Sequence, residues 1–496
     1  MKKIISIILL CSLLLTMLLA GTSCKDEATE IKDNTQNQTD EQNNTQPEET
    51  TEYIEAIDGG GKDFVILNRD VSEVYNAHPY AEFTAENETG DPINDAIYHR
   101  NRFIEEKYNI KIISATPTLD VVDMGNSIKR AHDAGDETYQ IASLALNQCF
   151  KLAYQGYIHD LNGIPHIDIS KPWWMTSMAK ASSIKGKNYY ISGDMNLGAF
   201  NTATCIFFTK QPLQDLSLEN PYTLVKEGKW TLDKLSEMCK AVTNDINGDS
   251  KIDHEDKVGI TTSSFAWQVF FYGADSLFVK KDENDIPSFL PLDERTYNVL
   301  SKVFDAVNNP VTSLNLAQIT GIDLLKVQTN MFEENRSLFM INNIYGTIPA
   351  RAMNTDLGIL PVPKYDESQK DYVSSLHGNN ATAMCVPTIN NNTDLAGRIL
   401  EDMTYMSNKI VRPAYYDITL KIKFAQDEES PKMLDLIFNK LIIDPVLLMW
   451  DGGQGVDGLL RTAMIENNKN FVSQIEANID SYNATINGFV EMFIEK

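Results

Sequence analysis

Acidic and amide side chains recur between residues 245 and 256 at a spacing that could bind a metal ion. If Asp245 is position 1, side-chain oxygens fall at positions 1, 3, 5, 9 and 12, and a backbone carbonyl is available at position 7. A seven-coordinate Ca²⁺ in a twelve-residue loop requires oxygen ligands at this spacing. The sequence therefore indicates a structural Ca²⁺ site, with these candidate ligands: Asp245, Asn247, Asp249, Lys251, Asp253 and Asp256.

Two positions of this loop depart from the usual calcium pattern. Ser250 stands at position 6, where a glycine normally makes the turn. Asp256 is shorter than the glutamate that usually binds the ion through both oxygens at position 12. The alternative interpretation is an Asn/Asp/Gly turn that only ends the preceding helix.

The residues before the loop predict an amphipathic helix that would position it. The Thr231 hydroxyl can cap the first turn, and Asp233 places negative charge where the helix dipole favours it. Trp230, at the start of this helix, is assigned to packing. The apolar residues recur at helical spacing and define one buried face: Leu232, Leu235, Met238, Cys239 and Val242.

The N-terminus predicts export from the cytoplasm. Lys2 and Lys3 precede an apolar run, Ile4–Ala20, as in a secretory signal peptide. An uncleaved membrane anchor is the alternative, because the run could marginally span a bilayer. Small residues precede Cys24, which favours lipoprotein processing with this cysteine as the lipidated N-terminus.

A polar, acidic stretch follows the cysteine. Residues 25–52 hold nine Asp and Glu against two Lys and almost no apolar side chains. A segment of this composition cannot bury enough surface to order itself. It predicts a disordered tether between the lipid anchor and a folded domain.

Composition bounds the partners and the size of the folded part. The chain carries 43 Lys and Arg against 69 Asp and Glu, a net charge of −26, which argues against a nucleic-acid partner. The length beyond the tether suits two lobes rather than one core. The cysteines show no C-x-x-C spacing, which leaves zinc unsupported. Buried free thiols are favoured over a disulfide for Cys149, Cys205, Cys239 and Cys385.

Buried strands alternate with helices along the first part of the chain. Phe64–Leu67, Ile110–Ile113 and Ile141–Leu146 read as strands, and Pro92–Tyr108 reads as a helix. This alternation predicts an α/β fold with an open, mostly parallel sheet. Asn147 directly follows a strand, at the edge where open α/β sheets bind ligands.

Several segments together resemble family 1 extracellular solute-binding proteins, the receptors of carbohydrate-type ABC importers. Besides residues 230–260, these are SKPWW (170–174), YYISGD (189–194), LGILPVPKYDE (357–367) and PAYYDITLK (413–421). The resemblance covers the chain from about Phe64 to the C-terminus. It implies a monomeric, lipid-anchored receptor that delivers a small-molecule solute, expected to be a sugar or oligosaccharide, to membrane permease subunits. No cofactor beyond the structural Ca²⁺ is expected.

The resemblance also implies a two-lobed, periplasmic-binding-protein-like fold of type II, with discontinuous lobes joined by hinge crossings. Such an arrangement suits closure around a ligand. The expected division is 1–23 signal peptide, 24–58 lipidated cysteine and tether, 59–192 and 361–440 first lobe, 193–360 second lobe, and 441–496 C-terminal helices on the second lobe.

Sugar recognition requires aromatic planes for stacking and polar side chains for the hydroxyls. Trp450 and Tyr345 resemble stacking aromatics of maltose-type receptors, and Trp267 occupies a third such place, although core burial is equally compatible with its neighbours. Trp174 and Asp451 are further candidates for ligand contact. The alternative role is packing for Trp174 and capping of the next helix for Asp451. Asp194 completes the set, because it lies at the expected crossing between lobes.

Enzymatic interpretations find little support. Residues 453–458 match G-x-G-x-x-G, but a dinucleotide-binding domain needs this turn at its start, and only 38 residues follow it. No H-E-x-x-H, G-x-S-x-G or P-loop pattern occurs. A secreted glycosidase stays open, because spacing alone selects no pair among the carboxylates. A surface glycan-binding or sensory lipoprotein is the main non-transport alternative.

Overall fold

The computed structural model describes residues 54–69, 80–118, 120–350, 353–378, 380–421, 428–450 and 453–494. The predicted signal peptide, Cys24 and most of the predicted tether lie outside these ranges. The described residues belong to a single compact unit. None of the helices in the described ranges is both long and apolar enough to cross a membrane.

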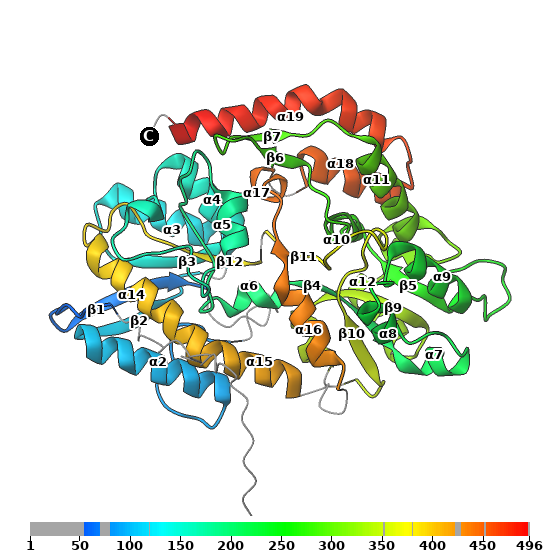
Figure 1. The fold of residues 1–496 in the computed structure, drawn as a ribbon, viewed down its shortest axis with the longest axis horizontal. Coiled ribbons are helices and arrows are strands. Elements are labelled where there is room, and N and C mark those ends of the chain that lie inside the picture. Colours follow the sequence, from blue (N-terminus) through cyan, green and yellow to red (C-terminus); the bar gives the residue numbers. More distant parts are fainter. Residues whose placement is uncertain are drawn as a thin grey trace, which may run out of the picture. The chain divides into compact units, whose positions relative to one another are not determined.

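The first lobe is built on a four-stranded sheet in the order β12-β3-β1-β2. β1 pairs in parallel with β2 and β3, while β12 pairs antiparallel with β3. The mostly parallel sheet expected from the sequence is therefore present, with one antiparallel edge strand contributed from late in the chain (Figure 1). The strands are β1 (Lys62–Asn68), β2 (Ile110–Ala115), β3 (Ile141–Ala145) and β12 (Thr382–Cys385).

Local sequence sets the helices of this lobe, as the first of them shows. The Asp91 carboxylate accepts the Ile93 backbone N–H at the start of α2, and Asn109 ends the helix in the left-handed conformation. The predicted boundaries of this helix are confirmed. The first-lobe helices are α2 (Pro92–Tyr108), α3 (Val121–Ala134), α4 (Leu146–Gln155), η1 (Leu161–Gly163), α5 (Thr176–Ser182), α14 (Thr393–Met406), the π-turn η4 (Ser407–Val411) and α15 (Arg412–Lys421).

The second lobe is built on a mixed five-stranded sheet in the order β10-β4-β9-β5-β8. β4 pairs antiparallel with β9 and β10, whereas β5 pairs in parallel with β8 and β9. The strands are β4 (Thr204–Thr209), β5 (Val258–Thr262), β8 (Ser313–Asn315), β9 (Ser337–Asn343) and β10 (Leu357–Leu360). A separate hairpin, β6 (Val279–Lys281) with β7 (Pro287–Phe289), precedes α11.

Helices and short turns surround this second sheet. The helix predicted after Trp230 forms as α9, with the Thr231 side chain accepting the Lys234 N–H and the predicted face buried. Trp230 is fully buried, which confirms its assignment to packing. The elements are α7 (Lys210–Asp215), α8 (Pro221–Lys226), α9 (Leu232–Val242), α10 (Ala266–Gly273), α11 (Glu294–Asn308), η2 (Leu316–Gln318), α12 (Leu324–Glu333), η3 (Ile344–Gly346), α13 (Thr347–Ala350), α16 (Ser430–Asn439) and α18 (Gly455–Glu466).

The chain passes between the two sheets more than once. It leaves the first sheet after β3, enters the second at β4 through α6 (Leu197–Asn201), and returns at β12. A small parallel pair, β11 (Ser374–Ser375) with β13 (Leu441–Ile442), joins the return segment to the segment before α17 (Val446–Met449). Neither lobe is therefore continuous in sequence.

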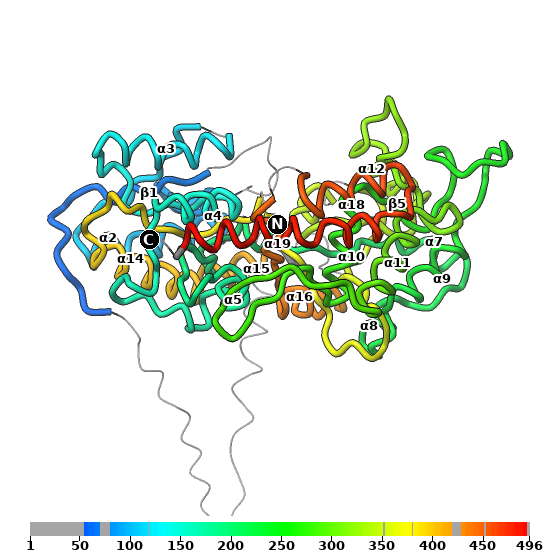
Figure 2. Tube along the Cα trace, turned by 90° about the horizontal axis from the view of Figure 1, so that it is seen from above, coloured from blue at the N-terminus to red at the C-terminus, as the bar shows by residue number. Residues whose placement is uncertain are grey.

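The last helix contacts both lobes. α19 (Phe471–Ile494) packs its first turn on the second lobe, where Phe471 stacks on Phe304 with ring centroids 5.5 Å apart. Its last turns reach α4 of the first lobe, where Phe489 lies 5.2 Å from Phe150 (Figure 2). The sequence predicted that the C-terminal helices pack on the second lobe. The additional contact with the first lobe arises because the apolar face of α19 extends along most of its length and is long enough to meet both lobes.

The described cysteines outside the N-terminal region are free and buried, as predicted: Cys149, Cys205, Cys239 and Cys385.

Candidate functional site

A small polar pocket lies where the two lobes meet. Its lining comes from α10 and α18 of the second lobe, from α17, and from the segment before β12. That segment is fixed to the first lobe, because the Asn147 N–H donates to the Gly378 carbonyl at 3.2 Å. The cavity volume is ≈ 20 Å³, enough for about one water molecule. Its lining residues are Gln268, His377, Gly378, Leu447, Trp450, Asp457 and Arg461.

A buried carboxylate organises the polar side of this pocket. Asp457 receives the Arg461 guanidinium through two contacts, Nε at 2.9 Å and Nη2 at 2.7 Å. The two residues lie one turn apart on α18, which places both side chains on one face. Gln268, from α10, donates to the same carboxylate at 2.7 Å. The network fixes a guanidinium and an amide at the point where the lobes meet.

An exposed aromatic face adjoins this network. The Arg461 guanidinium lies 3.9 Å from the centroid of the Phe265 ring, and the Phe265 side chain is 43 % exposed. His377 lies on the same side, with its ring centroid 6.5 Å from that of Phe265. Burial, together with the nearby Arg461 charge, holds the pKa of His377 below its usual value. Phe265 was not among the predicted site residues, although it directly precedes a helix that is buried throughout.

Trp450 contributes a second aromatic ring. It is half-buried, follows α17 and packs edge-on against Tyr482 of α19 at 5.5 Å. Gly455 lies against the ring, and a Cβ at that position would approach it to 2.5 Å. Gly455 also has a φ of +58°, so that both space and backbone conformation favour glycine there. Asp451 lies outside the described residues.

Asp194 lies in a different cluster. Its buried carboxylate pairs with Arg412 and accepts a hydrogen bond from Asn408 at 2.7 Å. Burial raises the pKa of Asp194, opposed by the Arg412 charge. Asn408 lies in the π-turn η4 and Arg412 directly follows it, and the Arg412 guanidinium lies 3.8 Å from the Phe200 ring centroid. None of these residues lines the pocket beside Trp450.

The other predicted aromatics do not line this pocket. Trp174 is buried and donates its indole N–H to Glu401 at 3.0 Å. Trp267 is fully buried among the rings of Phe271, Tyr272 and Phe278, which matches the core alternative noted from the sequence. Tyr345 is half-buried in η3, and burial raises its pKa. Of the predicted set, Trp450 lines the pocket and Asn147 adjoins it.

Larger hollows lie elsewhere on the surface. One of ≈ 510 Å³ is lined by residues of β4, α7, α8 and the segment before α16, including Phe208, Leu213 and Tyr222. Its lining belongs to the second lobe and to residues packed on it. We therefore place the candidate site at the smaller pocket, where elements of both lobes and α17 converge.

The predicted calcium loop is a compact turn whose oxygens converge. Carboxylate oxygens of Asp245, Asp249 and Asp256 lie within 4.8 Å of one another. Asp245 accepts backbone N–H groups of Gly248 at 2.6 Å and Ser250 at 2.8 Å. The residues present therefore suit an oxygen-ligated cation such as Ca²⁺.

The backbone of this loop also matches the expected geometry at position 6. Ser250 adopts a φ of +66°, the left-handed conformation for which glycine is usual at that position. The substitution noted in the sequence therefore leaves the turn intact. Asp256 is fully buried and accepts the backbone N–H groups of Ile246 and Asp253, which closes the loop on itself.

Solved structures of similar fold cover nearly the whole folded part of the chain. Maltose-binding MalE of Listeria monocytogenes, in complex with maltose, matches with a TM-score of 0.56 at 12% identity, over 87% of this chain and 98% of that one. The substrate-binding protein Lmo0181 of Listeria monocytogenes, in complex with cycloalternan, gives 0.54 at 12%, over 86% and 99%. The GacH receptor of Streptomyces glaucescens gives 0.51 at 13%, over 88% and 99%.

The chain has the two-lobed fold of a periplasmic binding protein. The fold class expected from the sequence is thus confirmed. No family model and no curated protein matches the sequence itself. In this periplasmic-binding-protein-like fold, the pocket beside Trp450 lies between the lobes.

A second buried carboxylate supports the turn that leads to Trp450. Asp444 accepts the backbone N–H of Val446, the first residue of α17, at 3.0 Å. It also accepts the backbone N–H of Phe278, at the base of the β6–β7 hairpin, at 2.7 Å. Burial raises the pKa of Asp444 to about 6.

This raised pKa predicts a pH-dependent stability difference between the wild type and Asp444→Asn. A carboxyl group whose folded-state pKa is raised contributes stability below its ordinary pKa, near 4, and loses it as pH rises through about 6. The free energy of unfolding of the wild type, minus that of the variant, should fall by up to about 3 kcal/mol between pH 4 and 7. Urea unfolding of both proteins at several pH values measures this difference in unfolding free energy. Glu466→Gln, at an exposed site, is the control. If the difference between the wild type and Asp444→Asn does not change with pH, as expected for the control, the assignment is contradicted.

Proposed function

We propose that the protein is a receptor that captures a carbohydrate outside the cytoplasm and delivers it to the permease subunits of an ABC importer. The observation that carries the proposal is the pocket between the lobes, which Trp450 lines together with the Asp457–Arg461 pair, and the Phe265 ring lies against Arg461. Solved proteins of the same fold hold maltose and cycloalternan. We expect a monomer that binds its solute and performs no catalysis.

The chemistry of the pocket suits a sugar. Pyranose rings present C–H groups on their faces, which pack on aromatic rings, and hydroxyls at their edges, which need donors and acceptors. Trp450 and Phe265 supply ring surface, while Asp457, Arg461 and Gln268 supply acceptors and donors already held in position by one another. Preorganised polar groups lose little freedom on binding, which favours affinity.

The pocket must enlarge before it can hold a sugar ring. A volume of ≈ 20 Å³ accommodates about one water molecule. The pocket lies between lobes that are linked by the crossing segments, β11–β13, α17 and α19, so a change in their relative position alters its size. Separation of the lobes would admit the sugar, and hinge closure would then hold it between them.

Sugar binding should depend on Trp450. We expect the wild type to show a raised melting temperature with at least one of maltose, maltotetraose and cycloalternan, the sugars held by solved proteins of this fold. Trp450→Ala should raise the dissociation constant at least about tenfold, because one stacking face is lost. Thermal unfolding scans measure the melting temperature, and isothermal titration calorimetry measures the dissociation constant. Tyr98→Ala, on the surface of α2, serves as the control and should bind like the wild type.

Two results would count against this assignment. A Trp450→Ala variant with unchanged affinity would move the sugar site away from this pocket. Release of shorter sugars from an oligosaccharide by the wild type would replace the receptor with a glycosidase.

We further propose that Cys24 is lipidated and that residues 25–52 tether the folded part to the membrane surface. Support comes from the apolar run, the small residues before the cysteine and the acidic composition after it. The full-length chain should fractionate with membranes, and Cys24→Ser should leave that fraction while still binding sugar. A Cys24→Ser protein that stays in the membrane fraction would favour an uncleaved anchor instead.

We also propose that the loop from Asp245 to Asp256 binds a structural Ca²⁺. Adding Ca²⁺ to protein treated with a chelator should raise the free energy of unfolding, by about 2.7 kcal/mol at a concentration 100 times the dissociation constant. Asp249→Asn should abolish most of this gain, because it removes a charged oxygen from the converging set. Asp233→Asn, an exposed carboxylate on α9, is the matched control. No stabilisation of the wild type by Ca²⁺ would leave a turn that needs no ion.

A further inference from the structure

The Arg461 guanidinium is engaged on two sides by the protein itself. One edge meets the Asp457 carboxylate, with Nε at 2.9 Å from one oxygen and Nη2 at 2.7 Å from the other. One face lies against the Phe265 ring, 3.9 Å from its centroid. This two-point contact is the strong geometry for an arginine and a carboxylate. A sugar in the pocket therefore meets an ion pair that is already formed, and it can reach only the remaining N–H donors.

The charges on the described lining of the pocket cancel. Among the described residues, Asp457 and Arg461 are the charged side chains that line it, and they pair with each other. His377 also lines the pocket, and burial together with the nearby Arg461 charge keeps the pKa of its imidazole below the usual value. The imidazole is therefore uncharged at neutral pH. Gln268 contributes an amide, which carries no charge.

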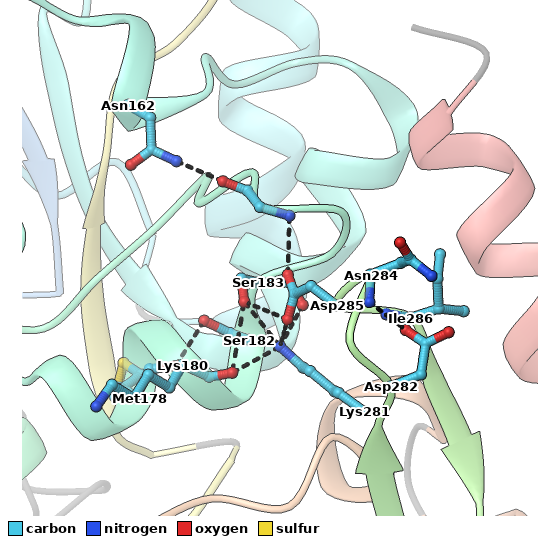
Figure 3. Close-up of polar contacts among 11 residues, drawn as sticks. Asn162, Met178, Lys180, Ser182, Ser183, Lys281, Asp282, Asn284, Asp285 and Ile286 are labelled. Atoms are coloured by element: carbon cyan, nitrogen blue, oxygen red, sulfur yellow. Dashed lines mark hydrogen bonds and ion pairs between the residues drawn. The ribbon is translucent and has the colours of Figure 1, made fainter.

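Charged groups on the other side of α17 are engaged in a similar way. Lys281, the last residue of β6, lines the small cavity there, and its ammonium lies 3.0 Å from the Asp285 carboxylate (Figure 3). It also donates to the Ser183 hydroxyl at 2.8 Å. The Asp444 carboxylate accepts backbone N–H groups from α17 and from the base of the β6–β7 hairpin. The negative charge of ionised Asp444 opposes the entry of an anionic sugar, as Asp457 does.

A sugar that carries a carboxylate would enter this pocket without a cation to balance it. A carboxylate that leaves water for a partly buried site loses hydration, and only a charged partner can offset that loss. The Arg461 charge is already balanced, and the buried Asp457 carboxylate would repel a second carboxylate beside it. An uncharged sugar needs hydrogen bonds only, which the guanidinium and the Gln268 amide can supply.

We propose that Asp457 is the specificity-determining residue of the pocket, because by balancing the Arg461 charge it makes the site select uncharged sugars and reject sugars that carry a carboxylate. This inference rests on the proposed function and narrows its substrate class to neutral oligosaccharides. The net charge of the whole chain, −26, cannot replace Asp457 in this role. Exposed charges farther than about 8 Å from the sugar are largely screened at physiological ionic strength, whereas a buried neighbour is screened much less.

Matched pairs of sugars test this selection on the wild type. Each of maltose, maltotetraose and cycloalternan is compared with the same sugar after its primary hydroxyls have been oxidised to carboxylates. The oxidation adds charge and leaves the rings and linkages in place. Isothermal titration calorimetry at one pH and one ionic strength measures both dissociation constants. For a sugar that binds the wild type, the oxidised form should bind at least about tenfold more weakly.

Asp457→Asn tests the residue itself. Asparagine has nearly the same shape but no charge, so Arg461 becomes an unbalanced cation in the pocket. The dissociation constant of the oxidised sugar divided by that of the neutral sugar should fall at least about tenfold relative to the wild type. Asp123→Asn, on α3, is the matched control, because Asp123 also pairs with an arginine, Arg130, at 2.8 Å. It changes the net charge equally and should leave the ratio unchanged.

Arg461→Gln makes the opposite change and keeps the inference testable if Asp457→Asn does not fold. It leaves the Asp457 carboxylate unbalanced. Relative to the neutral sugar, the same sugar with amino groups in place of its primary hydroxyls should then bind at least about tenfold better than it does in the wild type. Circular dichroism establishes that each variant is folded.

The outcomes separate this inference from the proposed function. A wild type that binds the oxidised sugar as well as the neutral one, or better, would overturn the role of Asp457 and leave the receptor function intact. Unchanged ratios in folded Asp457→Asn and Arg461→Gln would do the same. If neither form of any of these sugars binds the wild type, the proposed function fails, and this inference fails with it.

Discussion

The arrangement of the candidate site depends on one buried carboxylate and the turn it holds. Asp444 accepts backbone N–H groups from α17 and from the base of the β6–β7 hairpin, and it has no exposure to water. A buried carboxylate with two donors is costly to displace, because either donor would be left without a partner. The position of Trp450, which follows α17, is therefore tied to the second lobe and to the hairpin.

The same turn explains how two lobes can act as one receptor. Each lobe has its own sheet, and the chain links them through crossing segments, the β11–β13 pair and α19. On one side of α17 lies the polar pocket lined by Trp450, and on the other lies a small cavity lined by Leu448 and Met449. The turn therefore packs between the pocket and the interior of the protein, so that the position of Trp450 depends on contacts made by both sides of α17.

Features set by local sequence could be predicted well. The boundaries of α2 follow from a capping aspartate, a proline in the first turn and a left-handed residue at the end, all within the helix itself. The face of α9 follows from helical spacing, and the converging oxygens of the loop after it follow from residues at most eleven positions apart. Family motifs, rather than periodicity, indicated that the lobes are discontinuous.

The candidate site was harder to predict because it depends on contacts distant in sequence. Asp194 was singled out for hydroxyl binding, and residue spacing did not indicate that Arg412, 218 positions later, pairs with it. Trp267 lies inside an aromatic core, whereas Phe265, two residues earlier, is exposed under a guanidinium from α18. The spacing of residues along the sequence did not indicate the contact between Asp457 and Gln268, which lie 189 positions apart on different helices.

A crystal structure of the protein with bound oligosaccharide tests the central claim most directly. The account predicts a sugar ring against Trp450 or Phe265, with hydroxyls bonded to Asp457, Arg461 or Gln268, enclosed between the two lobes. A sugar bound in another part of the molecule, away from Trp450 and the Asp457–Arg461 pair, would contradict it.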